Sequence, residues 1–93
     1  MLTLDSYLHI PDNISCVQVD NDVVLLNTKT RFYFALSAVG ARFWDLISAE
    51  RSIRAAFKAL LVEYEVDAID LERDLLELTS SLMEHGLVDL VEG

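Results

Sequence analysis

Hydrophobic positions along this chain follow two spacings, and the change falls near residue 37. Before it, apolar residues recur at every second position or in short β-branched and aromatic runs, which is typical of strands. Three segments show this strand pattern: residues 16–20, 23–26 and 31–36. Turn-forming residues separate them, with Asn21-Asp22 after the first segment and a polar break at 27–30 after the second. We therefore predict a three-stranded antiparallel β-meander over residues 15–36.

After residue 37 the apolar spacing lengthens to about 3.6 residues and predicts three helices over residues 37–88. Ser37, Ser52 and Asp67 are the expected N-caps, and Gly86 is expected to end the third helix. The third helix carries two apolar stripes, one of Leu71, Leu75, Leu78 and Leu82 and one of Ile69, Leu76 and Met83. This apolar surface is wider than one core contact needs, so we expect two partners to pack against it.

The order of elements, strands first and helices second, indicates the α+β class. At 93 residues the chain makes a single domain over residues 1–93, because a second hydrophobic core would not fit. Residues 1–14 are the least regular part, since Tyr7 and Leu8 fit a short strand but His9 and Pro11 interrupt it. We expect a loosely held N-terminal arm there.

The composition is both hydrophobic and strongly acidic. Hydrophobic residues make up 53% of the chain and the mean hydropathy is +0.33, which excludes disorder as a description of the whole chain. Sixteen acidic residues against seven basic ones give a net charge of −9. This negative field repels phosphate backbones, so we expect no nucleic-acid partner.

The sequence gives no indication of secretion or membrane insertion. The N-terminus lacks the basic and long apolar regions of a secretory signal, and nowhere do eighteen apolar residues run together. Cys16 is the single cysteine and cannot form an internal disulfide. We therefore expect a cytoplasmic protein with no membrane partner.

Residues that carry catalysis or bind metals are few. Cys16 opens a predicted strand as a small buried hydrophobe, His9 lies in the arm, and His85 caps the end of the third helix. Three aspartates share one face of the third helix: Asp67, Asp70 and Asp74. We prefer a solvated acidic face to a metal site for them, because the glycine of a calcium loop is missing. We expect no cofactor, no metal and no catalytic residue.

The third predicted strand, residues 31–36, lies at the edge of the meander and leaves backbone groups unpaired. It contains no proline, glycine or internal charge, and its three consecutive aromatic residues favour pairing with another strand. Either the chain covers this edge with residues 1–14 or the last helix, or an extended peptide adds to it as a further strand. In the second case the additional apolar stripe of the third helix supplies a wall for the peptide.

Residues 24–46 carry a family resemblance. This segment, and above all Val39-Gly40-Ala41-Arg42-Phe43-Trp44, resembles the PqqD-like proteins, in particular the stand-alone precursor-recognition proteins of lasso-peptide biosynthesis. The resemblance extends over about residues 12–90 and includes the pattern of three helices. Within the segment we expect Gly40 to allow a close approach of the sheet or a helix, Arg42 to pair with Asp45 or an acidic helix, and Trp44 to pack in the core.

The resemblance implies a winged-helix-like fold, in which a three-stranded antiparallel sheet is followed by a three-helix bundle, with no catalytic activity. Such domains bind the leader segment of a ribosomally synthesised precursor peptide as a strand added to the third strand, facing the third helix. They deliver it to a separate leader peptidase and a cyclase. Carried over by position, the peptide-binding residues are Arg31, Phe32, Tyr33, Phe34 and Ala35 in the strand and Leu71, Asp74, Leu75 and Leu78 on the helix.

Two other functions are alternatives. A DNA-binding winged helix shares the coarse architecture, but residues 37–93 hold five basic and twelve acidic residues, whereas a recognition helix is basic. A small cysteine- or metal-dependent enzyme would need the fold to bring Cys16, His9 and His85 together.

Overall fold

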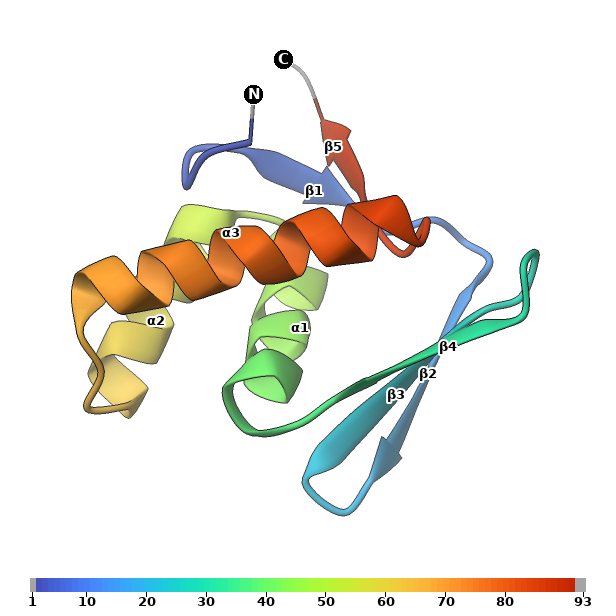
Figure 1. The fold of residues 1–93 in the computed structure, drawn as a ribbon, viewed down its shortest axis with the longest axis horizontal. Helices are drawn as coiled ribbons and strands as arrows, with labels where there is room; N and C mark the ends of the chain where they lie inside the picture. The colour runs from blue at the N-terminus through green and yellow to red at the C-terminus, as the bar shows by residue number, and fades with distance from the viewer. Residues whose placement is uncertain (1, 92–93) are drawn as a thin grey trace.

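The computed structural model describes residues 2–91, and strands precede helices in it as the sequence predicts. The elements in chain order are β1 (Tyr7–His9), β2 (Ile14–Val19), β3 (Asp22–Asn27), β4 (Phe32–Leu36), α1 (Ala38–Glu50), α2 (Ile53–Glu63), α3 (Ala68–Glu84) and β5 (Asp89–Val91). β2, β3 and β4 form an antiparallel sheet in that order, and the helices follow it along the chain (Figure 1). The predicted α+β fold is confirmed.

The β2–β3 hairpin turns one residue earlier than the sequence indicates. Asp20 and Asn21 form the turn, and Val19 pairs with Asp22. Asp20 has a φ of 57°, the left-handed conformation that two-residue hairpins need at their first turn position and that aspartate tolerates. Asp22 therefore begins β3 and does not belong to the turn.

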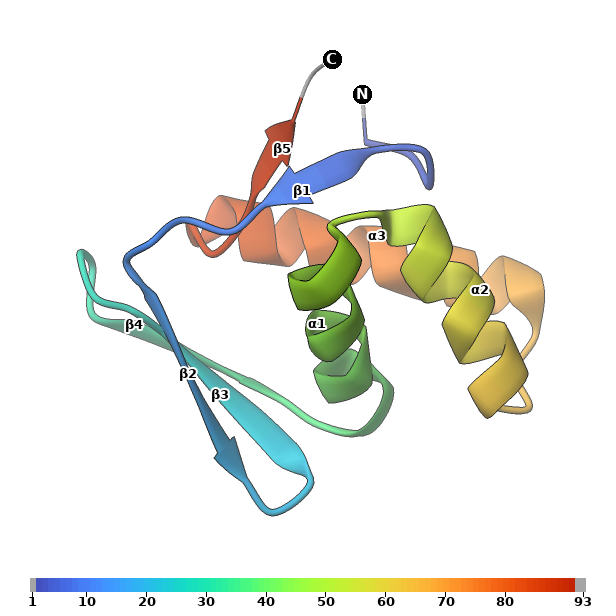
Figure 2. The same cartoon turned by 180° about the vertical axis from the view of Figure 1, so that it is seen from behind.

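The hydrophobic core lies between the sheet and the helices. Val23 and Leu25 are buried at alternate positions of β3, so one face of the sheet packs toward α1. α3 lies across α1 and α2, as two opposite views show (Figures 1 and 2). Several side chains from the helices have no exposed surface: Phe43, Ile47, Ile53, Leu60 and Leu82. These apolar contacts hold the three helices to one another and α1 to the sheet.

The predicted N-cap residues stand immediately before the three helices. Ser52 caps α2 and Asp67 caps α3, each by accepting hydrogen bonds from backbone N–H groups of the first turn. Ser37 stands at the N-cap position of α1 but makes no such side-chain bond. The residue after it, Ala38, has a left-handed φ of 50°, so this helix begins irregularly.

α3 ends in a glycine turn, as predicted. Gly86 has a φ of 71°, and Leu87 N–H donates to Leu82 O at 2.8 Å. Beside this turn lies the buried side chain of Asn27, the last residue of β3, which donates from Nδ2 to His85 O at 3.1 Å. The hairpin that leads into β4 is thereby held against the end of α3.

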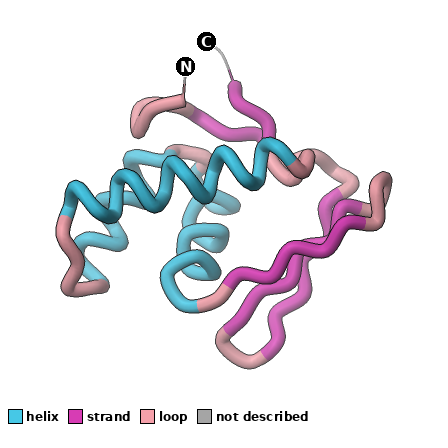
Figure 3. Tube along the Cα trace, viewed as in Figure 1, coloured by secondary structure: helices cyan, strands magenta, loops and turns pink. Residues whose placement is uncertain are grey.

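The N-terminal segment is not the loosely held arm that the sequence predicts. β1 pairs with β5 in an antiparallel register centred on Leu8 and Leu90 (Figure 3). Leu4 and Leu8 are buried, and Arg54 Nε donates to Asp5 Oδ1 at 2.6 Å. Local sequence could not reveal this pairing, because the partner strand lies at the opposite end of the chain. Residue 1 of the predicted arm lies outside the described residues.

Candidate functional site

β4 has one edge without a strand partner. It pairs with β3 from Asn27↔Phe32 to Val23↔Leu36, and it stands last in the sheet order β2-β3-β4. Across residues 2–91 no strand lies on its other side, since β1 pairs with β5 instead. The structure thus decides against coverage of this edge by the N-terminal strand, which is one of the two ways in which the chain itself could cover it.

Tyr33 and Ala35 direct their backbone N–H and C=O groups toward this edge. A two-residue turn makes Val19↔Asp22 a hydrogen-bonded pair, and the direction of bonding alternates along each antiparallel strand. The β4 residues that bond to β3 are therefore Phe32, Phe34 and Leu36. The backbone groups of Tyr33 and Ala35 point away from β3. An extended peptide beside β4 meets four backbone groups that can bond to its own main chain.

Side chains of β4 reach the helices at both ends of the strand. At the start, the ring of Phe32 stacks on His85 with 4.0 Å between centroids and 10° between planes. At the other end, a Cβ atom built on Gly40 would lie 3.5 Å from Leu36 Cδ2 and 3.7 Å from Leu78 Cδ2. A Cβ atom at those distances would make ordinary van der Waals contacts, so the structure does not bear out the close approach that the sequence predicts as the reason for Gly40.

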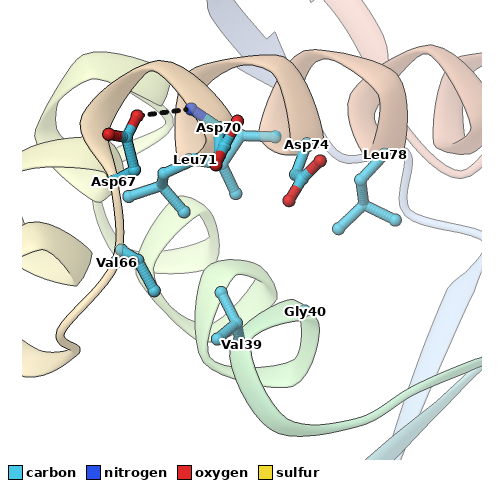
Figure 4. A pocket seen from close by; sticks show the side chains of 9 residues that line it. Val39, Gly40, Val66, Asp67, Asp70, Leu71, Asp74 and Leu78 are labelled. Carbon is cyan, nitrogen blue, oxygen red and sulfur yellow. Dashed lines mark hydrogen bonds between the residues drawn. The ribbon is translucent and has the colours of Figure 1, made fainter.

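A pocket of about 320 Å³ opens between α1 and α3, near the end of β4 (Figure 4). Four of the predicted site residues line it from α3: Leu71, Asp74, Leu75 and Leu78. Val39 and Gly40 line it from α1, and Val66 lines it from the connection between α2 and α3. Figure 4 shows Val39, Leu71 and Leu78 directed toward the space between the two helices. The structure thus gathers the helical half of the predicted site in one apolar pocket.

Carboxylates form an exposed rim on this pocket. Asp67, Asp70 and Asp74 line it from the first half of α3. Arg73 reaches Asp70 at 3.3 Å and Asp74 at 3.5 Å, so its single positive charge offsets only part of the charge of the three carboxylates and the rim stays negative. Such a rim favours a basic residue on a ligand. Within residues 2–91, no group of three or more His, Cys, Asp or Glu side chains is placed to hold a metal ion.

Arg31, which the resemblance assigns to the docking strand, lies in the turn before it. Its φ is 63° and its N–H donates to Asn27 O at 2.6 Å, so β4 begins only at Phe32. Arg31 therefore has an exposed side chain and does not belong to the strand.

Sequence reasoning missed part of the site. Val39 is not among the predicted site residues, yet it lines the pocket. His85 is the C-cap of α3, as predicted, and its ring also stacks on Phe32, which was not predicted. Asn27 was placed in a polar break, but its side chain is only 4% exposed and also accepts from Asn13 Nδ2 at 2.8 Å. No local signal identifies these contacts, because the crossing of the helices and the position of the hairpin determine them.

The residues considered for catalysis lie on separate elements. Cys16 is exposed on β2, contrary to the expectation of a buried thiol, because β2 is an outer strand that the core does not cover. His9 belongs to β1 and His85 ends α3. As for a membrane, no helix in the described part of the chain has the length and apolar character to cross one.

Arg42 and Trp44 have the structural roles that the sequence predicts. Trp44 is buried in the core, and Arg42 binds Asp45 at 2.7 Å and Glu63 at 2.9 Å. The hydrogen bonds to Glu63 raise the pKa of Arg42 and lower the pKa of the Glu63 carboxyl. Arg42 thereby joins α1 to the end of α2.

Comparisons with known proteins place this architecture in a family. Residues 22–88 match the family of Coenzyme PQQ synthesis protein D (PqqD). TbiB1 in complex with the TbiA(beta) leader peptide is similar with a TM-score of 0.82 and 35% identity, over 86% of this chain and 93% of TbiB1. A lasso peptide synthetase B1 complexed with the leader peptide gives a TM-score of 0.80 and 30% identity, over 89% of this chain and 98% of its own. No curated protein matches the sequence. The chain belongs to the PqqD family.

Proposed function

We propose that this protein recognises the leader segment of a ribosomally synthesised precursor peptide by adding it as a strand to β4, facing α3. The observation that carries the proposal is the open edge of β4 beside the pocket between α1 and α3. Hydrogen bonds between the main chains of β4 and the peptide do not depend on the peptide sequence, whereas the pocket selects an apolar side chain. Together they give an extended peptide both affinity and a defined register.

The solved relatives support this proposal. TbiB1 and the synthetase B1 were each solved with a leader peptide, and each matches more than four fifths of this chain. In this chain the contacts that we propose come from two elements: Phe32, Tyr33, Phe34 and Ala35 of β4 and Leu71, Asp74, Leu75 and Leu78 of α3. Arg31 adds a side-chain contact at the start of the strand.

The proposed role is recognition and delivery, without catalysis. The bound leader is delivered to a separate leader peptidase and a cyclase, and binding raises the concentration of precursor at those enzymes. A DNA-binding winged helix is the competing function. The acidic rim of α3 argues against it, because a helix that enters a DNA groove needs basic residues.

The contributions of edge and pocket are unequal. Four backbone hydrogen bonds at about 1 kcal/mol each and two or three buried anchors at about 1.5–3 kcal/mol each give roughly 7–13 kcal/mol gross. Association costs about 4 kcal/mol or more, which leaves affinities that range from millimolar to sub-micromolar. Because the backbone term is common to every peptide, the anchors in the pocket decide which leader binds tightly.

A titration tests the proposal directly. The labelled leader of the cognate precursor, a scrambled leader and a nonspecific DNA duplex are titrated with the protein at low salt, with fluorescence polarisation as the readout. We expect saturable binding of the leader and much weaker binding of the other two probes. Strong duplex binding without leader binding would establish the competing function instead.

A further inference from the structure

Asn27 has a buried amide side chain that none of the proposed peptide contacts uses. The side chain is only 4% exposed. Its Oδ1 accepts from the backbone N–H groups of Lys29 at 3.0 Å and Thr30 at 3.2 Å. Its Nδ2 donates to His85 O at 3.1 Å and to Gly86 O at 3.5 Å. A buried amide with its donor and acceptor both bonded fixes the segments that it connects.

The two ends of this amide act over different distances along the chain. Oδ1 bonds to groups two and three residues away, so it closes the turn that leads into β4. Nδ2 bonds to a carbonyl 58 residues away, at the end of α3. We call the bonds from Asn27 Nδ2 to His85 O and Gly86 O the latch. The oxygen therefore shapes one turn, whereas the latch fixes a strand relative to a helix.

The latch acts at the start of β4. Asn27 pairs with Phe32, the first residue of that strand, and the ring of Phe32 stacks on His85. A Cβ atom built on Gly86 would lie 3.0 Å from Asn27 Nδ2, so the glycine gives the amide room to reach the helix end. Because β4 is an outer strand of its sheet, its distance from α3 depends on such contacts at its ends.

We infer that Asn27 is a positioning residue for leader recognition, an inference that rests on the proposed function. Through the latch it holds the edge of β4 at the distance from α3 at which one peptide reaches both the strand and the pocket. Without the latch the strand has to be ordered as the peptide binds, and this ordering subtracts from the affinity. The apparent affinity then falls by the fraction of molecules whose strand is in place.

Asn27→Asp separates the two functions of the amide. The carboxylate keeps an acceptor for the N–H groups of Lys29 and Thr30, but it sets an oxygen against His85 O, where the latch needs a donor. The matched control is Asn21→Asp, which makes the same change of charge in the exposed β2–β3 turn. At pH 7.5 we expect Asn27→Asp to bind the labelled cognate leader about tenfold more weakly, chiefly through slower association, and Asn21→Asp to stay within about twofold.

Lower pH should restore the latch in Asn27→Asp. A protonated carboxyl has an O–H that can donate to His85 O, and burial favours this neutral form. Arg31, Glu84 and His85 line the same hollow as Asn27, and they are common to both proteins. The variant is therefore compared with the unmodified protein at each pH. We expect the tenfold difference to shrink to about twofold at pH 5.5, whereas an effect on the turn alone would keep the same ratio.

Gly86→Asn tests the latch from the helix side. Asparagine tolerates the left-handed φ of 71° at this position, but its Cβ displaces Asn27 Nδ2. We expect about three- to tenfold weaker leader binding. Combined with Asn27→Asp, it should add little further loss, because both substitutions break the same contact.

Circular dichroism identifies the variants that are folded, and leader affinity and association rate are compared among those. Full leader affinity at pH 7.5 in a folded Asn27→Asp or Gly86→Asn protein would overturn the inference. Fully additive losses in the double variant, or an equal loss in Asn21→Asp, would also decide against it. If Asn27→Asp is unfolded at pH 7.5, full affinity in Gly86→Asn is by itself sufficient to reject the latch. Failure of the unmodified protein to bind the leader would instead overturn the proposed function.

Discussion

β2 and β4 are the two outer strands of one sheet, and within residues 2–91 each leaves alternate backbone groups without a strand partner. β4 lies beside α3 and leads to a pocket lined by valines, leucines and a glycine under a carboxylate rim. β2 borders a hollow of about 340 Å³ that holds Gln18, Arg42 and Asp45 beside Trp44. In that hollow Arg42 already binds Asp45 and Glu63.

The comparison shows that an open edge does not by itself make a peptide site. The sequence of β2, from Ile14 to Val19, is as free of charge, proline and glycine as that of β4. What distinguishes β4 is its contact with the helices, because Phe32 stacks on His85 at the end of α3 and Leu36 lies beside Gly40 of α1. A peptide on β4 gains side-chain anchors, whereas a peptide on β2 meets polar groups that are already paired.

The largest effect should come from removing one outward N–H group on β4. Ala35→Pro deletes such a group without breaking a bond to β3, so the fold is kept while the carbonyl of the peptide opposite loses its partner. We expect leader affinity to fall about 10- to 100-fold by fluorescence polarisation, which corresponds to one lost bond and one unpaired group.

Gln18→Pro is the matched control, because it removes an outward N–H from the open edge of β2. It should leave leader affinity unchanged. Equal losses from Ala35→Pro and Gln18→Pro would mean that the two edges do not differ in function. A loss only in Gln18→Pro would move the peptide to β2.

A smaller effect should follow from filling the pocket at Gly40. Gly40→Leu places a branched side chain between Leu36 and Leu78, and we expect about tenfold weaker leader binding. Gly40→Ala adds only a methyl group at van der Waals distance and improves helix propensity, so the free energy of unfolding should rise by about 0.5–1 kcal/mol. Thermal melts and leader titrations measure the two quantities separately.

Ala49→Leu controls for a longer side chain on α1, because Ala49 is exposed and does not line the pocket. It should change neither leader affinity nor stability to a comparable extent. Full leader affinity in Gly40→Leu would show that the peptide bypasses the pocket, and the contrast between the two edges would then rest on the backbone of β4 alone.

These two edges also show how far the sequence predicts the structure. The aromatic strand, the caps at Ser52 and Asp67 and the stop at Gly86 follow from local chemistry, and the structure has them all. The pairing of β1 with β5 was missed because it joins the two ends of the chain.

The site itself was predictable only in part. Leu71, Asp74, Leu75 and Leu78 were carried over from the family pattern and do line one pocket. Val39 and Val66 were not identified, because the angle at which α1 and α3 cross decides which of their residues face the gap. Arg31 was misplaced by one residue, since nothing in an arginine signals the left-handed φ that it has in the turn. The exposure of Cys16 depends on which strands the helices cover, and hydrophobic periodicity does not report this.

The smallest expected effect comes from a substitution in the hollow beside β2. Arg42→Ala removes the ion pair with Glu63, and leader affinity should not change, because Arg42 lies in the hollow beside β2. The bond from Arg42 lowers the pKa of the Glu63 carboxyl below its ordinary value of 4.5 in the folded protein. The stabilisation is therefore complete above about pH 4.5 and is lost as the pH falls through the lower folded-state pKa.

Urea unfolding at pH 7 and pH 3 measures this difference. We expect Arg42→Ala to be slightly less stable than the unmodified protein at pH 7 and closer to it at pH 3, with a smaller gap at high salt because both partners are exposed. A gap of the same size at pH 3 would mean that Arg42 acts through packing of its aliphatic stem. If Arg42→Ala instead creates a second leader-binding site, the paired charges in this hollow are what keep the peptide on β4.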